Sequence, residues 1–285
     1  MAKLIDGKVI SASVKDRVRE EIDQLKQQGI ESCLAVIIVG DDPASKIYVA
    51  NKERACEYTG IRSEKYELPK DTTMDELLAL IERLNNDPSV NGILCQLPLP
   101  KGLDEQRVID AISPLKDVDA FHPVNVGKIM TGNFDFLPCT PAGIMEMLEY
   151  EGISVEGKQC VVIGRSNIVG KPMSMLLLHK NGTVTVCHSR TNELAKVTSS
   201  ADILVSAVGR ANFVTADMVK DGAVVIDVGM NRSQDGVLCG DVDFASVEPK
   251  ASHITPVPGG VGPMTISMLM KNTLTAVKKQ NNIKE

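Results

Sequence analysis

The chain contains no tryptophan among its 285 residues, and its aromatic content is only 3%. Aromatic stacking platforms of the kind that hold single-stranded nucleic acid are therefore scarce. Acidic side chains outnumber basic ones, and the net charge of −6 leaves no basic footprint for nucleic acid or for an anionic membrane. We expect neither nucleic acid nor a membrane among its partners.

Long apolar runs, paired cysteines and clustered histidines are missing as well. The longest clean apolar run, residues 33–39, is far too short to span a bilayer, and the first residues carry charges where a secretory signal peptide is apolar. The seven cysteines include no C-x-x-C pair and stand mostly in apolar stretches, as free thiols do in a reducing compartment. The four histidines show no metal-ligand spacing. We therefore expect a cytoplasmic protein without a metal site.

Length and the order of the predicted elements favour two α/β domains. A chain of 285 residues exceeds the usual size of a single core. Residues 1–120 alternate β-α-β-α-β, which is typical of an α/β domain. The elements predicted there are a first helix at 14–25, strands at 34–39, 65–68 and 92–97, and helices at 45–58 and 73–84.

Residues 121–263 are expected to form a second, Rossmann-like α/β domain, with a cleft between the two. The Asp-, Gly- and Pro-rich residues 116–139 predict an irregular loop that crosses between the domains. Thr140 and Pro141 predict the start of a helix, and a final helix at 264–280 is expected to pack back near the first domain. The strands and the tight loop predicted between these helices lie at 160–163, 183–187, 203–208, 224–228 and 255–263.

A glycine turn after the strand at 160–163 indicates a phosphate site. Gly164 ends the strand and Gly170 precedes a helix, so backbone N–H groups and a positive helix end would face the same point. Dinucleotide-binding turns usually read G-x-G-x-x-G, whereas this one has Ser166 in the middle place and its last glycine one residue late. An ordinary strand–turn–helix is the alternative.

The residues around this turn favour NADP over NAD. An NAD site places an acid near the end of the second strand, about 20 residues past the first glycine. Here His188, Ser189 and Arg190 follow that strand, and Arg165 stands in the glycine turn. Arginine and serine suit a 2′-phosphate better than a free hydroxyl. Solvated loop residues are the alternative.

Tyr48 and Lys52 are the first candidates for chemistry. Their spacing puts both on one face of a helix, about 6 Å apart. Short-chain dehydrogenases carry a similar Y-x-x-x-K pair, but after their glycine turn, whereas this pair precedes the turn by more than a hundred residues. Gln96, at the end of a predicted strand, could orient the amine of Lys52, because a buried amide needs partners. A surface lysine and a half-buried tyrosine are the alternative.

Loop residues supply the remaining candidates. Asp117 and Asp119 stand in the predicted crossing loop with His122 close by, and solvated acids are the alternative. Glycines at 259, 260 and 262 either contact a ligand or simply shape a turn.

Six motifs occur in one order along nearly the whole chain. They are Tyr48-Val-x-x-Lys52, Gln96-Leu-Pro-Leu-Pro100, Lys116-Asp-Val-Asp119, Pro138-Cys-Thr-Pro141, Gly164-Arg-Ser-x-Ile-Val-Gly170 and Pro256-Val-Pro-Gly-Gly-Val-Gly-Pro-Met264. In these motifs the chain closely resembles the bifunctional methylenetetrahydrofolate dehydrogenase/cyclohydrolase family of folate one-carbon metabolism. Two positions depart from it: Ala120 stands where the family usually has Gly, and Met230 where it more often has Ile. A methyl group at Ala120 would shift the loop that carries Asp119.

The resemblance implies an enzyme with two steps at one site. NADP⁺ takes a hydride from 5,10-methylenetetrahydrofolate, and water then opens the 5,10-methenyl cation to 10-formyltetrahydrofolate. The folate nitrogens push out the hydride, so the first step needs alignment rather than an acid or a base. The second step needs a base or a polarising group near the bridging carbon.

The resemblance also implies roles for individual residues. Lys52 would act as the base, Gln96 would position its amine, Tyr48 would stack on the folate ring, and Asp119 would accept hydrogen bonds from the pterin. Further substrate contacts would come from Cys95, Leu97, Pro258, Gly259, Gly260 and Val261. The NADP contacts would come from Gly164, Arg165, Ser166, Ser189, Arg190 and Met230.

Two alternatives to a bifunctional enzyme stay open. Changes at Lys52 and Gln96 would indicate a monofunctional dehydrogenase without the hydrolytic step, and both residues are intact. A non-catalytic NADP- or folate-binding regulator would have lost parts of the site, and none of the six motifs is broken. The resemblance also suggests a homodimer, formed through the nucleotide domain.

Overall fold

A computed structural model describes residues 1–233 and 235–283, and the chain divides into two compact units. The six-stranded unit comprises Met1–Ser11 and Thr140–Thr265. The three-stranded unit comprises Ala12–Cys139 and the chain from Ile266 on. Each unit has a parallel sheet of its own, which confirms the expected α/β fold class.

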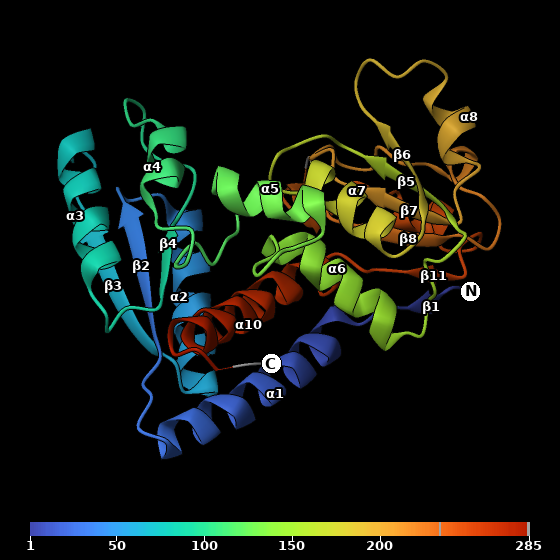
Figure 1. Ribbon diagram of the computed structural model, residues 1–285. Helices are drawn as coiled ribbons and strands as arrows, with labels where there is room; N and C mark the ends of the chain where they lie inside the picture. The colour runs from blue at the N-terminus through green and yellow to red at the C-terminus, as the bar shows by residue number, and fades with distance from the viewer. Residues whose placement is uncertain (234, 284–285) are drawn as a thin grey trace. The chain divides into compact units, whose positions relative to one another are not determined.

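Three parallel strands form the sheet of the three-stranded unit, in the order β3-β2-β4 (Figure 1). Two long helices, α1 and α10, each begin in the six-stranded unit and end in this one. No helix in the described parts of the chain is both long and apolar enough to cross a bilayer. The elements are α1 (Gly7–Gln27), β2 (Cys33–Val39), α2 (Pro43–Thr59), β3 (Arg62–Leu68), α3 (Met74–Asn86), β4 (Gly92–Cys95), α4 (Glu105–Ala111), α5 (Pro123–Thr131) and α10 (Val261–Gln280).

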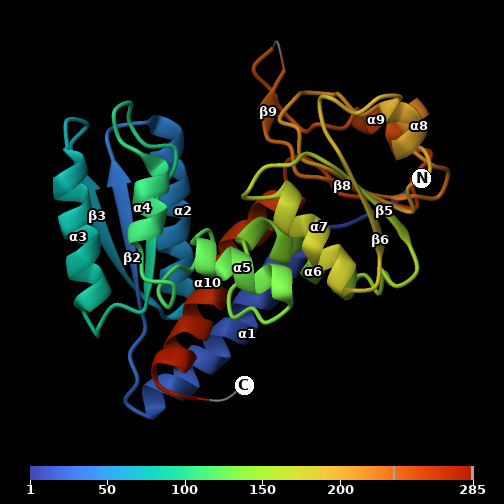
Figure 2. The same cartoon turned by 45° about the horizontal axis from the view of Figure 1, so that its top comes forward.

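The central strand β2 is buried along its whole length, so both of its faces pack on other elements. Figures 1 and 2 show α3 and α4 on one face of this sheet and α2 on the other. Every second residue of β2 joins the core beneath α3 and α4, as the two-residue period of a strand requires: Cys33, Ala35, Ile37 and Val39. A capping box begins α3, because the side chain of Thr73 accepts from Glu76 N and that of Glu76 accepts from Thr73 N.

The sheet of the six-stranded unit has the order β1-β11-β8-β7-β5-β6, and neighbouring strands pair in parallel. A separate two-stranded antiparallel ribbon joins β9 and β10. The elements are β1 (Lys3–Leu4), α6 (Cys139–Tyr150), β5 (Gln159–Ile163), α7 (Gly170–His179), β6 (Thr183–Cys187), α8 (Leu194–Thr198), β7 (Ile203–Ser206), the 3₁₀ helix η1 (Ala216–Met218), β8 (Val224–Asp227), β9 (Asn231–Arg232), β10 (Leu238–Cys239), α9 (Phe244–Val247) and β11 (His253–Ile254).

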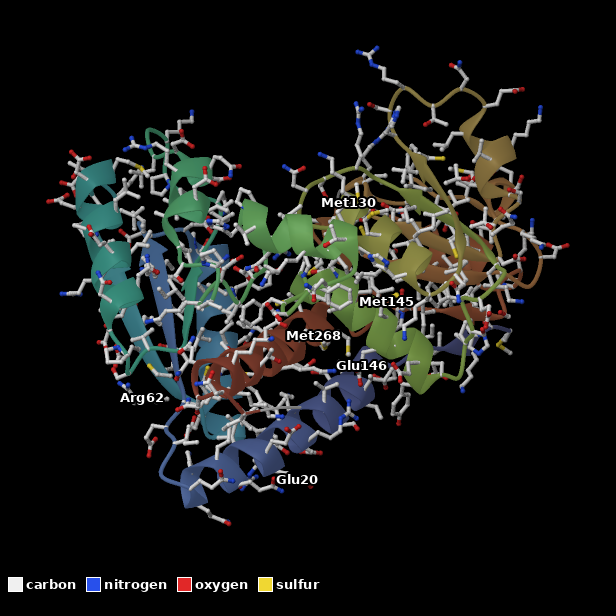
Figure 3. The ribbon with its side chains drawn as sticks, viewed as in Figure 1. Glu20, Arg62, Met130, Met145, Glu146 and Met268 are labelled. Carbon is white, nitrogen blue, oxygen red and sulfur yellow. The ribbon has the colours of Figure 1, made fainter. Side chains whose placement is uncertain are left out.

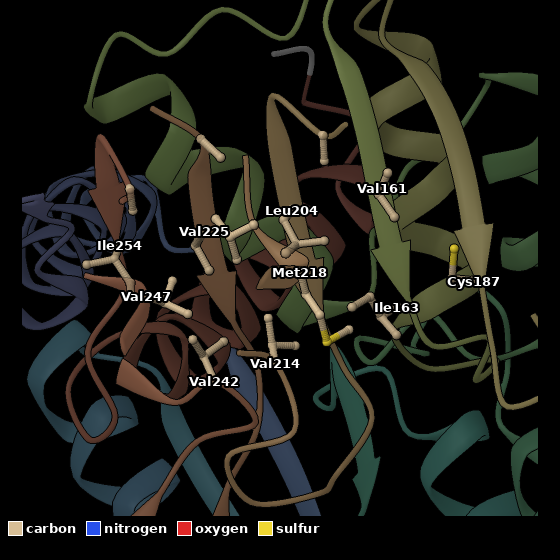
Figure 4. Packing of buried hydrophobic residues seen from close by; sticks show 14 residues of the cluster. Val161, Ile163, Cys187, Leu204, Val214, Met218, Val225, Val242, Val247 and Ile254 are labelled. Atoms are coloured by element: carbon tan, nitrogen blue, oxygen red, sulfur yellow. The ribbon is translucent and has the colours of Figure 1, made fainter. Parts of the chain in front are cut away.

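One face of this sheet packs on η1, α8 and α9, and the cluster it forms is shown in Figure 4. Val161 and Ile163 of β5, Leu204 of β7 and Val225 of β8 supply the strand side of the cluster. Helix α7 contacts β5 and β6 from the other face (Figure 2). The sheet is therefore covered on both faces, as doubly wound parallel sheets are.

The expectation of an irregular loop over 116–139 is wrong, because helix α5 lies within it. His122 caps α5 by accepting from Val124 N, Pro123 occupies its first turn, and Gly132 ends it in a left-handed conformation. Met130, labelled in Figure 3, lies near its end. Its exposed fraction is 67%. Such a short helix, containing Gly127 and Asn125, lacks the long apolar stripe that a sequence pattern can reveal. Helix α4 was not predicted either, although Asp104 caps it by accepting from Gln106 N and Arg107 N.

Several boundaries also differ from the prediction. Helix α6 begins at Cys139, so Thr140 lies inside it rather than at its cap, and its hydroxyl is 3.1 Å from that of Thr265. Helix α10 begins at Val261, inside the stretch expected to be a loop. The units differ from the expected ranges 1–120 and 121–263, because β1 pairs with β11 and thereby joins the first residues of the chain to the six-stranded unit.

Candidate functional site

Lys52 and Gln96 form a hydrogen bond in the three-stranded unit, with Lys52 Nζ donating to Gln96 Oε1 at 2.8 Å. Lys52 lies on α2, and Gln96 directly follows β4, where its N–H continues the pairing with β2 through Ile37 O at 2.8 Å. The other end of the amide is also held, since Gln96 Nε2 donates to Leu97 O at 2.6 Å. The oxygen and the nitrogen of the Gln96 amide therefore each have a hydrogen-bond partner, and the oxygen faces the amine of Lys52.

The neighbours of this pair differ in exposure. Tyr48 lies one helical turn before Lys52 on α2 and is 39% exposed, which leaves part of its ring open to a ligand. Cys95, the last residue of β4, is buried, and Leu97 is half-buried. Burial, with a further contribution from the negative charge of Asp119, raises the pKa of the Cys95 thiol to about 12. The Cys95 thiol is therefore neutral, and it lines the site rather than acting as a nucleophile.

The carboxylate of Asp119 lies within the electrostatic reach of Lys52. Burial raises its pKa from 3.8 to about 6, the positive charge of Lys52 lowers it, and the negative charge of Asp117 raises it further. A small cavity of about 10 Å³ lies beside Asp117 and Asp119, lined otherwise by Ile93, Cys95, Leu97, Val108, Ile109, Ile112 and Phe121. This mostly apolar lining explains why the two carboxylates are poorly solvated.

The three residues before Asp119 are each anchored to a different helix. Lys116 Nζ donates to Leu84 O at 2.9 Å and to Asp87 O at 2.6 Å, at the end of α3. Asp117 accepts from the first residues of α5, and Val118 O accepts from Asn272 Nδ2 of α10 at 2.8 Å. Asp117 is therefore a buried anchor and not the solvated loop acid that sequence reasoning left open. The anchoring roles of Lys116 and Asn272 had no signal in the sequence beyond their residue types.

Ala120 completes this turn with φ at +60° and a fully buried side chain, and its N–H donates to Asp117 O at 3.1 Å. A left-handed conformation costs an alanine about 1 kcal/mol or more relative to glycine. The glycine usual in the resembling family would adopt it freely. The turn nevertheless keeps Asp119 within the electrostatic reach of Lys52.

In the six-stranded unit, the predicted glycine turn joins β5 to α7. A Cβ atom on Gly164, whose φ is +131°, would lie 2.5 Å from Ala207 O, and one on Gly170 would lie 2.2 Å from Gly164 O. Both positions therefore require glycine. Ser166 Oγ accepts from the N–H groups of Val169 and Gly170 at 3.2 and 3.3 Å, so this side chain holds the turn that leads into α7.

Two neighbouring strands place the basic residues expected to bind NADP. Arg165 follows β5, while Ser189 and Arg190 follow β6, and all three are exposed. The two strands pair directly, and Gly164 N donates to Cys187 O at 2.9 Å. Residues 188–192 contain no acid. Two guanidinium groups and a hydroxyl at adjacent strand ends fit a 2′-phosphate, and a carboxylate that would bind a free ribose hydroxyl is missing from this stretch.

The remaining expected contacts lie on two other segments of the six-stranded unit. Met230 follows β8 and is 51% exposed. Pro258 is exposed and Gly259 is half-exposed, whereas Gly260 and Val261 are buried against the start of the chain. A Cβ atom on Gly7 would lie 1.8 Å from Gly260 O, and Ser11 Oγ donates to Pro263 O at 3.0 Å. Sequence reasoning missed this support, because residues 7 and 11 are so distant in the chain.

Comparison with known proteins divides the chain into two parts that largely, but not fully, coincide with the two units. Residues 5–119 match the model of the tetrahydrofolate dehydrogenase/cyclohydrolase catalytic domain. Residues 138–281 match the model of the tetrahydrofolate dehydrogenase/cyclohydrolase NAD(P)-binding domain. The two matches together cover most of the chain.

Relatives and solved structures agree with these matches. The bifunctional protein FolD of Agathobacter rectalis is 63% identical over 98% of this chain and 100% of its own length. The bifunctional FolD of Campylobacter jejuni superposes with a TM-score of 0.96 at 51% identity, covering 98% of this chain and 99% of that one. The Trypanosoma brucei enzyme, solved with NADP cofactor and an inhibitor, superposes with a TM-score of 0.93 at 39% identity, covering 98% of each. The chain belongs to the tetrahydrofolate dehydrogenase/cyclohydrolase family.

Proposed function

We propose that this enzyme catalyses two successive steps of folate one-carbon chemistry. It oxidises 5,10-methylenetetrahydrofolate to 5,10-methenyltetrahydrofolate with NADP⁺, and it hydrolyses the product to 10-formyltetrahydrofolate. The observation that carries the proposal is the 2.8 Å hydrogen bond from Lys52 to Gln96, close to the Asp119 carboxylate, in a member of this family.

The oxidation needs no acid or base from the protein side chains. The folate nitrogens drive the hydride from the methylene carbon, and NADP⁺, when bound, accepts it. The chain has to hold the folate in the correct orientation. Tyr48 would stack on the folate ring, and Asp119 in its ionised form would accept hydrogen bonds from the amino and N–H groups of the pterin. Further substrate contacts would come from Cys95, Leu97, Pro258, Gly259, Gly260 and Val261.

The hydrolysis needs a proton acceptor. Water adds to the bridging carbon of the methenyl cation, and the amine of Lys52 would act as the base that takes one proton from it. The bond from this carbon to N5 then breaks, the second water proton passes to N5, and the carbon remains on N10 as a formyl group. Gln96 Oε1 would hold the amine in place through the bond already present.

The preference for NADP over NAD rests on charge. Arg165, Ser189 and Arg190 lie at the ends of two paired strands, where the 2′-phosphate of a dinucleotide would sit. Gly164 leaves room for the backbone to approach the cofactor, Ser166 shapes the start of α7, and Met230 would lie against the cofactor.

The homodimer and the compartment are part of the proposal. Strand β6 lies at one edge of its sheet with Thr183, Thr185 and Val186 exposed, and an exposed edge strand favours pairing with a second chain. Sedimentation would then give twice the chain mass of 30.7 kDa. All seven cysteines are free thiols, which supports a reducing compartment such as the cytoplasm.

The deciding experiment mixes the purified enzyme with 5,10-methylenetetrahydrofolate and either NADP⁺ or NAD⁺, and follows reduced nicotinamide and the methenyl intermediate together. NADPH formation with little accumulated methenyl product establishes both activities. NADPH formation with methenyl decay at the uncatalysed rate leaves a monofunctional dehydrogenase. No reduction of either cofactor contradicts the proposal and favours a binding protein.

A further inference from the structure

Two buried carboxylates, Asp227 and Asp241, lie at the carboxyl end of the six-stranded sheet and belong to none of the motifs above. Asp227 is the last residue of β8, and Asp241 follows β10. Their exposed fractions are 4% and 0%. Buried carboxylates are rare unless they are fully hydrogen-bonded, so the groups that bind them show what they do.

Asp241 binds the backbone that leaves the neighbouring strand β7. Its two oxygens accept five hydrogen bonds, three of them from the N–H groups of consecutive residues. The donors are Val208 N at 2.7 Å, Gly209 N at 3.3 Å, Arg210 N at 2.9 Å, Ser206 Oγ at 3.2 Å and Asn231 Nδ2 at 2.9 Å. One side chain therefore fixes the loop after β7 and ties it to Asn231, the residue after Met230.

Asp227 binds the segments that flank Asp241. Its oxygens accept from Gly229 N, Asp241 N and Val242 N, each at 2.9 Å. The backbone presses closely on both acids, since a Cβ atom on Gly229 would lie 2.3 Å from Asp241 Oδ1 and one on Gly240 would lie 1.8 Å from Asp227 Oδ2. The two carboxylates and the two glycines form one rigid connection between the ends of β7 and β8.

These strand ends lie at the edge where doubly wound sheets bind dinucleotides. The 2′-phosphate residues Arg165 and Ser189 lie at the ends of β5 and β6, and β7 and β8 continue the same sheet on the other side of β5. A dinucleotide held at β5 and β6 would therefore extend its other half toward the loops that Asp241 holds. Asp241 itself is fully buried, so it does not touch the cofactor.

We propose that Asp241 is a positioning residue for the nicotinamide cofactor, which acts by setting the backbone of residues 208–210 and tying it to residues 229–231. The proposal rests on the proposed function, because it names a residue that serves the same dehydrogenase site. Asp227 supports it by holding Asp241 N and Gly229 N. Acceptor-only oxygens are required here, because nearly all of the partners are N–H donors.

The test is the Asp241→Asn variant, which keeps the volume but replaces one acceptor oxygen by an NH₂ group that faces N–H donors. We expect the KM for NADP⁺ to rise about tenfold. The KM for 5,10-methylenetetrahydrofolate should change by less than about twofold, as should hydrolysis of added 5,10-methenyltetrahydrofolate, since cyclohydrolysis needs no cofactor chemistry and uses Lys52 of the other unit.

A matched control exists at the opposite end of the same sheet. Asp202 precedes β7, and its oxygens accept from Gln159 N at 2.9 Å and from Lys220 Nζ at 2.6 Å. Asp202→Asn makes the same chemical change away from the dinucleotide edge and should leave the KM for NADP⁺ unchanged.

Should Asp241→Asn fail to fold, Ser206→Ala removes one donor to Asp241 from a fully buried position and should raise the KM for NADP⁺ about threefold.

The outcomes separate positioning from plain stability and from the proposed function. An unchanged KM for NADP⁺ in Asp241→Asn, or in Ser206→Ala if that variant has to be used, overturns the proposal. A proportional loss of both activities with a lower melting temperature also overturns it, because it indicates a general structural role. The Kd for NADP⁺ is also measured by direct titration of the wild type and the variant. If the wild type binds NADP⁺ but shows no catalysis, only the proposed function is contradicted, and the role of Asp241 is then tested by comparing the two Kd values.

Discussion

Lys52 Nζ donates a 2.8 Å hydrogen bond to Gln96 Oε1, and this contact ties helix α2 to the end of strand β4. Since Gln96 Nε2 is occupied by Leu97 O, the amide cannot turn without losing both bonds. The amine is therefore held at one place, close enough to Asp119 to lower the pKa of that carboxyl. A fixed amine is what the proposed role of Lys52 as the base of the hydrolytic step requires.

Replacing Lys52 tests its role as the base. Lys52→Met should lower the cyclohydrolase rate by about 100- to 10,000-fold, the usual contribution of a general base. Binding of folate and of NADP⁺ should persist. The rate is measured by the loss of methenyl absorbance after correction for the uncatalysed reaction. Lys46→Met on the same helix is the matched control, because Lys46 is exposed and forms an ion pair with the exposed Asp41. Normal hydrolysis by Lys52→Met would remove this lysine from the mechanism.

Replacing Arg165 tests how the 2′-phosphate is recognised. A charge-assisted hydrogen bond contributes about 1.5–3 kcal/mol, so Arg165→Ala should raise the KM for NADP⁺ about 10- to 100-fold. The KM for NAD⁺ should change little, because NAD⁺ has no phosphate at that position. Initial rates with both cofactors give the comparison, and Arg107→Ala on α4 serves as an exposed arginine control. Equal losses for the two cofactors would show that the phosphate is bound elsewhere.

The pKa of about 6 at Asp119 predicts a pH profile for substrate capture. Only the ionised carboxylate accepts hydrogen bonds from the pterin, so kcat/KM for 5,10-methylenetetrahydrofolate should rise between pH 5 and 7, with a midpoint near pH 6. Asp119→Asn should lose this dependence, and comparing the two enzymes cancels the pH-dependent chemistry of the substrate. An identical profile in the variant would assign the ionisation to another group.

The raised pKa of Asp119 also affects the stability of the fold. Whereas substrate capture should increase with pH, this contribution to stability should decrease. Because the folded pKa of Asp119 lies above its ordinary value of 3.8, the folded enzyme binds this proton more tightly than the unfolded chain does. The contribution of Asp119 to the free energy of unfolding is therefore highest below about pH 4 and falls as the pH rises to about 6. Urea unfolding of wild type and Asp119→Asn across this range measures the difference.

Replacing Lys116 tests the anchoring of the turn that carries Asp119. Lys116→Met would remove the shorter of the two hydrogen bonds at each of the carbonyl groups of Leu84 and Asp87, which would keep only those from Asp87 N and Val90 N, and it should lower the free energy of unfolding by about 1–3 kcal/mol. The KM for the folate substrate should rise as well, because the turn loses its connection to α3. Lys196→Met, at a side chain 77% exposed, is the control for losing a surface lysine. A stable variant with a normal KM would contradict the anchoring role.

Local sequence patterns were sufficient for many elements of both units. Three such elements each depend on residues that are close together in the sequence. They are the apolar, β-branched run of β2, the capping box of α3 and the glycine turn at Gly164. Helix spacing and a strand end also made Tyr48, Lys52 and Gln96 candidates, but local pattern left a surface lysine and a half-buried tyrosine as the alternative, and only the resemblance to the family implied their roles. Helix α5 was missed because its apolar stripe is too short to be recognised, although residues typical of helix ends flank it: His122, Pro123 and Gly132.

Only the tertiary structure decided which acids are buried anchors. Asp117 and Asp241 look like ordinary polar loop residues in the sequence, and Asp227 stands in a predicted strand, yet each is buried and bound by backbone or side-chain donors. The donors to Asp241 at the end of β7 and just after it, like the partner of β1 in β11, come from distant parts of the chain. The sequence determined the elements, the chemical inventory and the family motifs, because these follow from local geometry and residue type. The long-range hydrogen bonds that hold Asp119 and the loop after β7 in place depend on the packing of the whole unit, which no local pattern encodes.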